Sequence, residues 1–554
     1  MPKAPPPLRI GLDLGDQSLT ALVLHPSGQL RCHHAQLEPG TQLAQILSPL
    51  LPPQPMPVEA ILASRRHWSA LRRGVRVALL ITEGFEDVLR LDSRLQAAPA
   101  SGALALSELC PPELCLGVPE RLGADGSVVR SLTSEALIEL RERVAALQVA
   151  AVAVVLLHSY QNDAHERTVA EALAPLGIPV SLSSQIARVP DERLRTRATL
   201  LDACLAPTLD AELRSLRSLG PVRVMCVESS GNAVPCTQEP AQVLPLRTAL
   251  SAVAAGLRGI QRIAAANGLT RFIALAADDS CATLALCDPA LPSGLRSPFS
   301  TSGGTAPASI PELGPGLLPE ILPELIAELP AQGFQVVSYE PGQALEPLHA
   351  ALLALTVEQG HDPAEYPIIP YGSAGPSFAA ALAERLGSPS VWAPPAPGLI
   401  AAYGALCSPV VCQRRELLLV EASSAQQTGQ VSATLHALTS RLRAELRTAG
   451  LITSDHLPGH EWLAELRYLG QRHALTLQGV SDGGPAGSGT SDLVVRFCDE
   501  HERRYGFRLP ECPVELVALR VRVSVAAVTL TPGHAALVRL AAELATAERP
   551  QPPG

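Results

Sequence analysis

The sequence predicts an α/β fold divided into several domains. Apolar strands alternate with helices along most of its 554 residues, which is the pattern of a sheet covered by helices. Hydrophobic residues make up 47% of the chain and charged residues only 17%, so large buried cores are expected. A chain of this length exceeds what one hydrophobic core supports, and about three or four domains are expected.

The N-terminal third begins with short strands and continues into strand–helix alternation. Residues 8–34 are predicted to form strands joined by turns at Gly15-Asp16 and Pro26-Ser27-Gly28. A polar, proline-rich passage follows at 38–57, and a buried strand is predicted at 75–81. Residues 133–147 carry apolar side chains at helical spacing after a Thr-Ser-Glu start, and they lead into an apolar strand at 151–157.

The middle of the chain continues this alternation. The pattern predicts strands at 180–182, 222–228 and 272–276, and helices at 193–219 and 249–267. Residues 288–330 are rich in Pro, Gly and Ser, and they predict an irregular connection with one helix near 318–328. Helices and strands resume over 345–393.

A last domain is predicted from the C-terminal pattern. It contains a strand at 415–421, a helix at 430–449, a strand at 462–468, a flexible Gly/Ser/Asp loop at 481–491, and a helix before a strand at 514–526. The tail after residue 548 is expected to be disordered.

Charge and composition exclude several classes of function. The net charge of −10 and pI of about 5.8 argue against binding to nucleic acid or to a membrane surface. Lys3 is the only lysine among 43 basic residues, which excludes a Walker-type P-loop. The arginine bias could serve phosphate binding, but a GC-rich coding sequence explains it better. The N-terminus lacks an apolar signal segment and the longest apolar run, 149–157, is too short to span a bilayer, so we expect a soluble cytoplasmic protein.

The cysteines predict no metal centre. Most of the twelve stand singly in apolar stretches, as buried reduced thiols do. The closer pairs, Cys110 with Cys115 and Cys407 with Cys412, have no second pair at zinc-ribbon spacing.

The most informative stretch is the first hairpin. An apolar strand ends in Asp13-Leu14-Gly15, and a polar turn leads into a second strand. Phosphate-binding hairpins often begin this way, because glycine lets the backbone approach an anion and the aspartate can hold a metal ion or orient a water. Turns of this composition are also common without any function.

Nine segments in one order resemble the A-type subunit of the hydantoinase/5-oxoprolinase family. The most specific two contain Thr82-Glu-Gly-Phe-Glu-Asp-Val-Leu89 and Arg467-Tyr-Leu-Gly-Gln471. The others are residues 9–15, 151–160 with His165-Glu166, 192–196 with 205–207, 371–376, 397–404, 501–506 and 514–520. The family includes ATP-dependent cyclic-amide hydrolases and some ATP-dependent ketone carboxylases.

The resemblance implies an actin/hexokinase-like (RNase H-like) two-lobe ATPase fold with a smaller C-terminal α+β domain. The expected divisions are 8–185, 186–410 with a shortened connection at 288–330, and 411–548. By this resemblance, vestigial nucleotide-binding candidates are Asp13, Gly15, Gln17, Ser280, Gly372, Ser373 and Gly375. Asp278 and Asp279 are weak candidates for metal ligands, although two solvated turn carboxylates are the better interpretation; no metal and no catalytic residue is assigned.

The departures from the family pattern concentrate in its phosphate turns. Asp16 replaces the second glycine of the first turn, and two charges about 4 Å apart at an effective dielectric constant near 20 repel by about 4 kcal/mol. In the second turn, Asp278 and Asp279 replace both glycines, and Ala276 and Thr283 replace aspartates. The family's His-Gly-Thr-Thr has no counterpart in 62–68, its Gly-Pro turn is lost in 251–256, and Ser373 and Phe378 replace a glycine and a histidine.

Three functions follow from this pattern. The first is a catalytically degraded A-like chain that acts as a structural or regulatory subunit, with no cofactor expected. The second is an active ATP-dependent hydrolase of 5-oxoproline- or hydantoin-like amides, or a subunit of a ketone carboxylase, which would need Mg-ATP. The third is a binding module for another small ligand.

We further predict that Asp13 and Gly15 face Asp278 and Asp279 across a cleft, and that ATP binds weakly or not at all because no lysine offsets the carboxylates. A homo-oligomer, or a hetero-complex with A-type or B-type subunits, is expected, through an apolar surface on the second lobe or C-terminal domain. His165 and His501 each precede a glutamate on a helix, where a lone histidine is usually a surface or packing residue.

Overall fold

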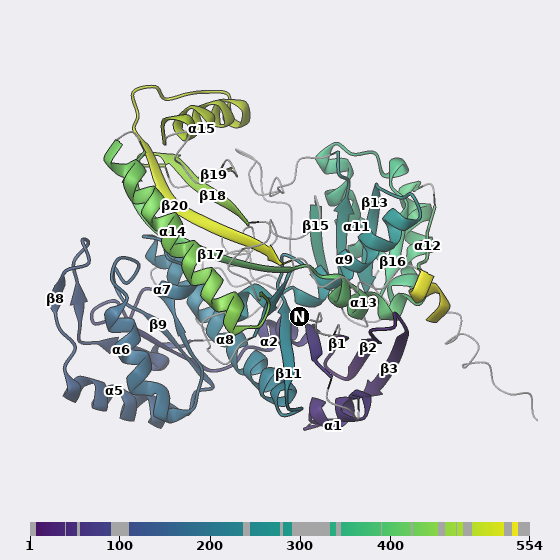
Figure 1. Cartoon of the computed structure of the whole chain (residues 1–554), viewed down its shortest axis with the longest axis horizontal. Coiled ribbons are helices and arrows are strands. Elements are labelled where there is room, and N and C mark those ends of the chain that lie inside the picture. The colour runs from purple at the N-terminus through teal and green to yellow at the C-terminus, as the bar shows by residue number, and fades with distance from the viewer. Residues whose placement is uncertain are drawn as a thin grey trace, which may run out of the picture. The chain divides into compact units, whose positions relative to one another are not determined.

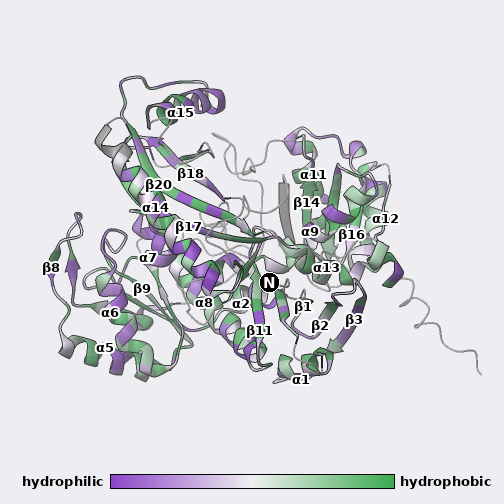
Figure 2. Ribbon diagram, in the orientation of Figure 1, coloured by the Kyte–Doolittle hydropathy of each residue, from purple (hydrophilic) through white to green (hydrophobic). Residues whose placement is uncertain are grey.

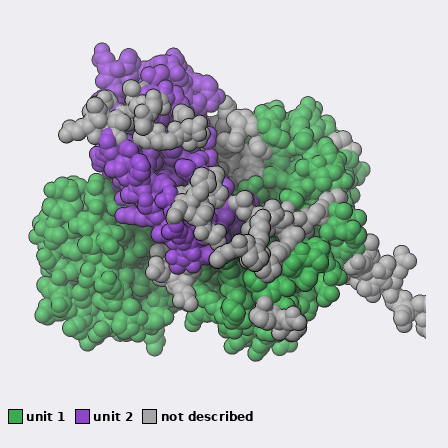
Figure 3. Space-filling view, in the orientation of Figure 1, with its two compact units in different colours: residues 1–408, 530–554 green, residues 409–529 purple. Residues whose placement is uncertain are grey.

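The computed structural model divides into two compact units (Figures 1 and 3). Unit 1 comprises Met1–Ser408 with Leu530–Gly554, and unit 2 comprises Pro409–Thr529. The residues described are all except 1–6, 39, 53–55, 90–109, 237–243, 278–280, 291–332, 339–344, 389, 423–424, 453–459, 472–473, 480–489, 526–534 and 541–554.

The first sheet of unit 1 begins with an antiparallel meander of β1 (Leu8–Leu14), β2 (Ser18–Leu24) and β3 (Leu30–Gln36). The strands β4 (Val58–Ser64) and β11 (Val222–Val227) continue the sheet in parallel with β1, and β12 (Ala233–Pro235) pairs antiparallel with β11. A short helix, α1 (Leu43–Leu47), lies between β3 and β4 in the chain. The order is therefore β3-β2-β1-β4-β11-β12.

A second sheet repeats this arrangement. Here β13 (Phe272–Ala277), β14 (Cys281–Cys287) and β15 (Gly333–Ser338) form the antiparallel meander, and β16 (Ile368–Tyr371) lies parallel to β13. The order β15-β14-β13-β16 matches β3-β2-β1-β4 strand for strand in direction. The ends of β1 and β13 therefore occupy equivalent places in the two sheets.

Two helices join these sheets in one core. α9 (Ser251–Ala266) and α13 (Ile400–Cys407) pack on each other and on side chains of β2, β13 and β16. The opposite face of the second sheet is covered by α11 (Leu345–Leu355) and α12 (Gly375–Leu386). Helices thus cover both faces of the second sheet, as in other α/β proteins.

A separate sheet of four parallel strands completes unit 1. Its order is β10-β9-β5-β6, from β10 (Val180–Leu182), β9 (Ala151–Val155), β5 (Val77–Thr82) and β6 (Cys115–Val118). All residues of β5 and β9 are buried, and Figure 2 shows apolar colouring along β9, because parallel strands are covered on both faces. The surrounding elements are α5 (Ser134–Leu147), α6 (Ala164–Leu173), α7 (Ser183–Ile186), α8 (Glu192–Arg217) and the hairpin β7 (Arg121–Leu122) with β8 (Val128–Arg130).

Unit 2 is an antiparallel sheet with two helices. Its strand order is β19-β18-β20-β17, from β19 (Leu475–Gln478), β18 (His460–Tyr468), β20 (Val514–Val525) and β17 (Val410–Glu421). The helices are α14 (Ala425–Thr448) and α15 (Thr490–Tyr505). On the sheet, the buried Glu465 of β18 accepts hydrogen bonds from Arg520 of the adjacent β20 and from Arg415 of β17, the strand beyond it. Burial acts to raise the pKa of its carboxyl, but these ion pairs hold that pKa below the usual value.

The α/β class predicted from the sequence is confirmed, and so are most of the predicted strands. Several strands were missed, among them β4, which follows the proline-rich passage, and β14, which follows directly on the paired aspartates. The others are β15 and the short strands β6, β7, β8, β12 and β19. The strand predicted at 415 begins at Val410, because arginines interrupt its apolar pattern. Thr133 does cap α5 through a hydrogen bond from the N–H of Ala136. The helix predicted near 318–328 lies outside the described residues, and among those described no helix could cross a bilayer.

The buried carboxyl of Asp202 on α8 gives a prediction about stability and pH. It accepts hydrogen bonds from Ser181 and from the N–H of Leu246, but burial raises its pKa to about 6. Folding therefore favours the protonated form, and stability falls as pH rises from about 4 to 6, by on the order of 3 kcal/mol. We expect Asp202→Asn to be more stable than wild type at pH 8 by about 1 to 3 kcal/mol, and to lose this advantage near pH 4. Urea unfolding of both proteins at both pH values measures the difference in stability. The same difference between variant and wild type at pH 8 and at pH 4 would show that the pKa of Asp202 is not raised.

Candidate functional site

The first hairpin turn is occupied by an ion pair. Asp13, at the end of β1, is 5% exposed and makes a two-point contact with Arg65, from Nη2 to Oδ2 at 2.7 Å and from Nε to Oδ1 at 3.2 Å. The N–H of Gly15 donates to the carbonyl of Ser18 across the turn. The carboxylate of Asp13 therefore already has a cationic partner, in the place where a bound metal ion would be expected.

A second arginine holds the backbone of the same turn. Arg66, the first residue of α2 (Arg66–Arg73), donates from Nε to the carbonyl of Gly15 at 2.8 Å and from Nη2 to that of Asp16 at 3.4 Å. The carbonyl of Gln17 accepts from Leu37. Both arginines belong to the segment that replaces the family's His-Gly-Thr-Thr. Weak ATP binding was expected because no lysine offsets the carboxylates of this turn. The structure places two positively charged guanidinium groups, those of Arg65 and Arg66, at the same turn.

A buried polar network lies beneath these arginines. His67 of α2 contacts the carboxylate of Glu212 from Nε2 at 2.9 Å and the carbonyl of Thr248 from Nδ1 at 3.0 Å. Glu212 also accepts from the hydroxyl of Ser64, and Ser64 and Ser251 exchange hydrogen bonds. Burial alone would lower the pKa of His67, but the charge and hydrogen bond of Glu212 outweigh it and raise the pKa. The network fixes α2, and with it the arginines, to α8 and α9.

The predicted glycine turn after β16 is hydrogen-bonded to the end of β13. Gly372 has φ of 81°, a backbone conformation that favours glycine, and its N–H donates to Pro397. The N–H of Ala374 donates to the carbonyl of Ala277, at the end of β13. The preceding residue, Tyr371, is buried against Gly256; burial raises the pKa of its hydroxyl, and the charges of Arg65 and Asp13 also act on it. Ser373 is exposed and Gly375 buried.

The second phosphate turn lies outside the described residues. Asp278, Asp279 and Ser280 fall between β13 and β14, whose last pair is Ala277 with Ala282. A cleft between Asp13 and these aspartates therefore remains a prediction. Within the described part of the chain, no three His, Cys, Asp or Glu side chains are grouped so as to hold a metal ion.

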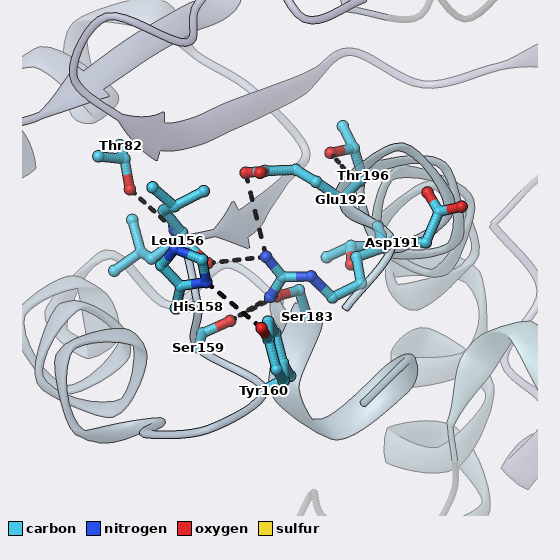
Figure 4. A network of polar contacts seen from close by, with 12 residues as sticks. Thr82, Leu156, His158, Ser159, Tyr160, Ser183, Asp191, Glu192 and Thr196 are labelled. Atoms are coloured by element: carbon cyan, nitrogen blue, oxygen red, sulfur yellow. Dashed lines mark hydrogen bonds and ion pairs between the residues drawn. The ribbon is translucent and has the colours of Figure 1, made fainter. Parts of the chain in front are cut away.

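A second cluster, which sequence reasoning did not assign, lies at the carboxyl edge of the parallel sheet (Figure 4). Arg195 of α8 is fully buried and donates to the hydroxyls of Ser159 and Ser183 and, at 3.0 Å, to the carbonyl of Leu156. Leu156 and Ser159 follow β9, and Ser183 follows β10. One guanidinium thus joins two strand ends to a helix.

Buried carboxylates complete this cluster. Glu166 is fully buried and accepts from the N–H groups of Leu156 and Ser184 and the hydroxyl of Ser183. His165 contacts Glu120 at 2.7 Å. His165 is therefore a packing residue, as the sequence suggested. His501 is one too: in unit 2 it is 2% exposed and is surrounded by the rings of Tyr468, Phe497, Tyr505 and Phe507.

Two titratable groups flank the Arg195 guanidinium. His158 follows β9 with φ of 58°, which is unusual for a residue other than glycine. Burial, Arg195 and Arg121 lower its pKa, so the imidazole is neutral at pH 7. Burial raises the pKa of Glu192, and the same two arginines oppose that shift. Groups whose environments shift their pKa values in this way often mark binding or catalytic sites. In the sequence, a polar residue closely following a buried strand, such as His158 after β9, could have indicated this cluster.

Comparison with known proteins finds two family models and several relatives that match parts of this chain. Residues 68–177 match the family described as hydantoinase/oxoprolinase N-terminal region, and residues 342–414 match the family described as hydantoinase/oxoprolinase. The chain is 30% identical over 230 residues to the acetophenone carboxylase gamma subunit of Aromatoleum aromaticum, across 37% of this chain and 30% of that protein. It is 27% identical over 170 residues to the caprolactamase subunit alpha of Pseudomonas jessenii, across 30% of this chain and 24% of that one. These matches span less than a third of the length of either relative.

Two solved structures share the fold over most of the chain. A nucleotide-free acetone carboxylase structure superposes with a TM-score of 0.69 at 16% identity, covering 95% of this chain and 88% of that chain. The ATP-dependent caprolactamase from Pseudomonas jessenii gives a TM-score of 0.62 at 18% identity, with the same coverage. The resemblance predicted from the sequence is confirmed.

Proposed function

We propose that this chain is a member of the hydantoinase/oxoprolinase family and serves as a structural or regulatory subunit without ATP chemistry of its own. The observation that carries the proposal is the ion pair between Asp13 and Arg65, together with Arg66 on the carbonyls of the same turn. A nucleotide phosphate and its metal would have to displace both arginines from their partners. Breaking a partly buried two-point ion pair costs more than an exposed one, because the freed carboxylate loses its counter-charge.

The actin/hexokinase-like architecture is part of this proposal. Its support is the repeated strand order β3-β2-β1-β4 and β15-β14-β13-β16, with helices α9 and α13 in the core between the sheets. In such a duplicated fold, the turns after β1 and β13 would be the places where phosphates are bound. We propose that the turn after β1 is retained as a structural hairpin.

An active ATP-dependent enzyme is the second candidate. It is favoured by the same arginines, since guanidinium groups at the turn offset its carboxylates and are good phosphate ligands. In that case, binding of Mg-ATP would redirect Arg65 and Arg66 from the turn to phosphate oxygens. The reaction would then be ATP-dependent amide hydrolysis or ketone carboxylation, as the names of the two solved structures suggest.

Thermal unfolding in the presence of Mg-ATP separates the two candidates. The subunit proposal predicts that 1 mM Mg-ATP leaves the unfolding midpoint unchanged. This concentration is about a thousandfold above the dissociation constant of a micromolar site, and an active site of that affinity would stabilise the protein by about 4.1 kcal/mol. A midpoint that rises only when magnesium and ATP are both present would contradict the proposal. Titration with AMP controls for unspecific anion effects.

A partner subunit is the second part of the proposal. The two relatives compared by sequence are a gamma and an alpha subunit by name. In unit 2, Leu469, Tyr505, Phe507 and Leu509 are exposed by 57%, 53%, 46% and 39%. The rings of Tyr505 and Phe507 contact His501, the N–H of Leu509 donates to the hydroxyl of Tyr468, and Leu469 directly follows Tyr468 in the chain. Large exposed apolar side chains gathered in one place are typical of a protein interface.

Co-expression with A-type and B-type subunits of the same family, followed by size-exclusion chromatography with light scattering, tests this part. We expect a complex that the double change Tyr505→Ser with Phe507→Ser weakens at least tenfold. The exposed pair Val128→Ser with Val129→Ser in unit 1 is the control and should leave the complex intact. If the chain stays monomeric when it is co-expressed with each of these subunits, the proposal of a partner subunit is wrong.

A further inference from the structure

Two cysteines of unit 1 lie with their sulfur atoms almost in contact. Sγ of Cys110 is 3.5 Å from Sγ of Cys115, and neither cysteine is part of a disulfide. A disulfide bond is about 2 Å long, so the two sulfur atoms have to approach by about 1.5 Å to form one. Small rotations about the Cα–Cβ bonds can provide this movement. The two thiols are therefore within reach of one covalent bond.

The chain between the two cysteines is a turn that two prolines restrict. Its sequence is Cys110-Pro-Pro-Glu-Leu-Cys115, and a 3-10 turn spans Pro112–Leu114. The N–H of Leu114 donates to the carbonyl of Pro111, and that of Cys115 donates to the carbonyl of Pro112. Because a proline ring fixes its own φ, this turn has few alternative conformations. The proximity of the thiols is thus built into the local sequence.

The two thiols differ in their exposure to solvent. Cys115 begins β6, the last strand in the order β10-β9-β5-β6, and it is partly exposed. Cys110 is only 2% exposed. The hydrogen bond with Cys115 and burial raise the pKa of the Cys110 thiol, so this thiol stays protonated at neutral pH, whereas a thiolate is the reactive form. An oxidant from the solvent therefore meets Cys115 first.

A second pair of cysteines in the same chain is equally close but buried. Sγ of Cys236 lies 3.1 Å from Sγ of Cys226 on β11, and these residues are 9% and 1% exposed. The hydrogen bond with Cys236 and burial raise the pKa of Cys226. Because neither thiol is open to solvent as Cys115 is, the buried pair separates the effect of proximity from the effect of access.

We propose that Cys110 and Cys115 form a reversible disulfide in the native protein, with a hydroperoxide as the oxidant and Cys115 as the first thiol to react. The Cys115 thiolate attacks one peroxide oxygen, so that an S–O bond forms and the O–O bond breaks. The second oxygen leaves as hydroxide and takes up the proton that Cys115 had released, which gives water.

Cys110 then resolves the sulfenic acid on Cys115. Its sulfur attacks the Cys115 sulfur, the S–S bond forms, the S–O bond breaks, and the leaving hydroxide takes the Cys110 proton as a second water. The two thiols lose two electrons in total, and hydrogen peroxide gains them. The site is separate from the first hairpin turn, so this oxidation does not depend on whether ATP binds there.

Peptide mapping of the native full chain after treatment with hydrogen peroxide tests the proposal. Trypsin releases each pair in one peptide, residues 95–121 and residues 224–247, and N-ethylmaleimide marks the thiols that remain after unfolding. We expect peptide 95–121 to lose two hydrogens and both labelling sites at least about tenfold faster than peptide 224–247. Dithiothreitol should restore both sites. Equal rates in the two peptides, or a cross-link in 95–121 only after unfolding in urea, would overturn the proposal.

Single variants test the order of the two steps. In Cys110→Ser, the sulfenic acid on Cys115 has no resolving thiol and should be trapped by dimedone. In Cys115→Ser, the buried Cys110 should stay reduced. Cys512→Ser removes a partly exposed cysteine of unit 2 and is the control that should leave the cross-link unchanged. Dimedone on Cys110 in Cys115→Ser, with none on Cys115 in Cys110→Ser, would show that the assigned roles are wrong.

Discussion

Replacing Gly404 by alanine is expected to destabilise unit 1 by about 3 kcal/mol or more. A Cβ atom at Gly404 would lie 1.7 Å from the carbonyl oxygen of Ala255 and 2.9 Å from the nitrogen of Gly259. Both are backbone atoms of α9, so no side chain can move away to make room. The helices would have to separate, and α13 also packs its Ala402 carbonyl against Gly11 of β1. The strain would therefore reach the strand that carries Asp13.

The matched control is six residues away. A Cβ atom at Gly398 would meet nothing within 4 Å in the described part of the chain, and the residue does not have positive φ, so Gly398→Ala should stay within about 0.5 kcal/mol of wild type. Urea unfolding followed by circular dichroism measures both variants. Similar urea midpoints for Gly404→Ala and Gly398→Ala would show that α9 and α13 do not cross as closely as the structure has them.

Replacing Arg195 by methionine is expected to cost about 3 to 5 kcal/mol. Methionine keeps much of the volume, but the hydroxyls of Ser159 and Ser183 and the carbonyl of Leu156 lose their donor. The buried carboxylate of Glu166 also loses the positive charge that acts on it from α8. Because both changes fall in a site that water does not reach, solvent cannot compensate for them.

Arg193→Met on the same helix is the control for this variant. Arg193 is exposed, and its replacement should change the unfolding midpoint little, since exposed ion pairs contribute about 0 to 1 kcal/mol. If Arg195→Met is as stable as Arg193→Met, the network at the carboxyl edge does not hold the strand ends together.

The fold could be predicted from the sequence wherever one strand or helix shows its own periodicity. The strands after 75 and 151 and the helix after Thr133 are examples, because their apolar runs are bounded by turn or cap residues. β4 was hidden by the prolines before it, and β14 by its place directly after the paired aspartates. Neither the duplication of the two sheets nor the pairing of β4 with β11 has a local signal, because both join segments far apart in the chain.

The candidate positions of the site were chosen from local motifs, whereas the groups that contact them could not be predicted from the sequence. Asp13, Gly15 and the turn at Gly372 could be selected from local motifs, and the structure brings Tyr371 within reach of Asp13's charge. The partner of Asp13 could not be found in this way, because Arg65 is 52 residues away. The cluster of His158 and Glu192 depends on strand ends and a helix meeting, which only the folded chain shows.

Isothermal titration calorimetry with Mg-ATP tests the central claim most directly. The claim is that Arg65 and Arg66 occupy the first hairpin turn in place of a nucleotide phosphate and its metal. The full chain should show no binding heat with up to 1 mM Mg-ATP, and Asp13→Asn should behave in the same way. Binding with micromolar affinity in the wild type that Asp13→Asn abolishes would contradict the account, because Asp13 would then serve the nucleotide rather than Arg65.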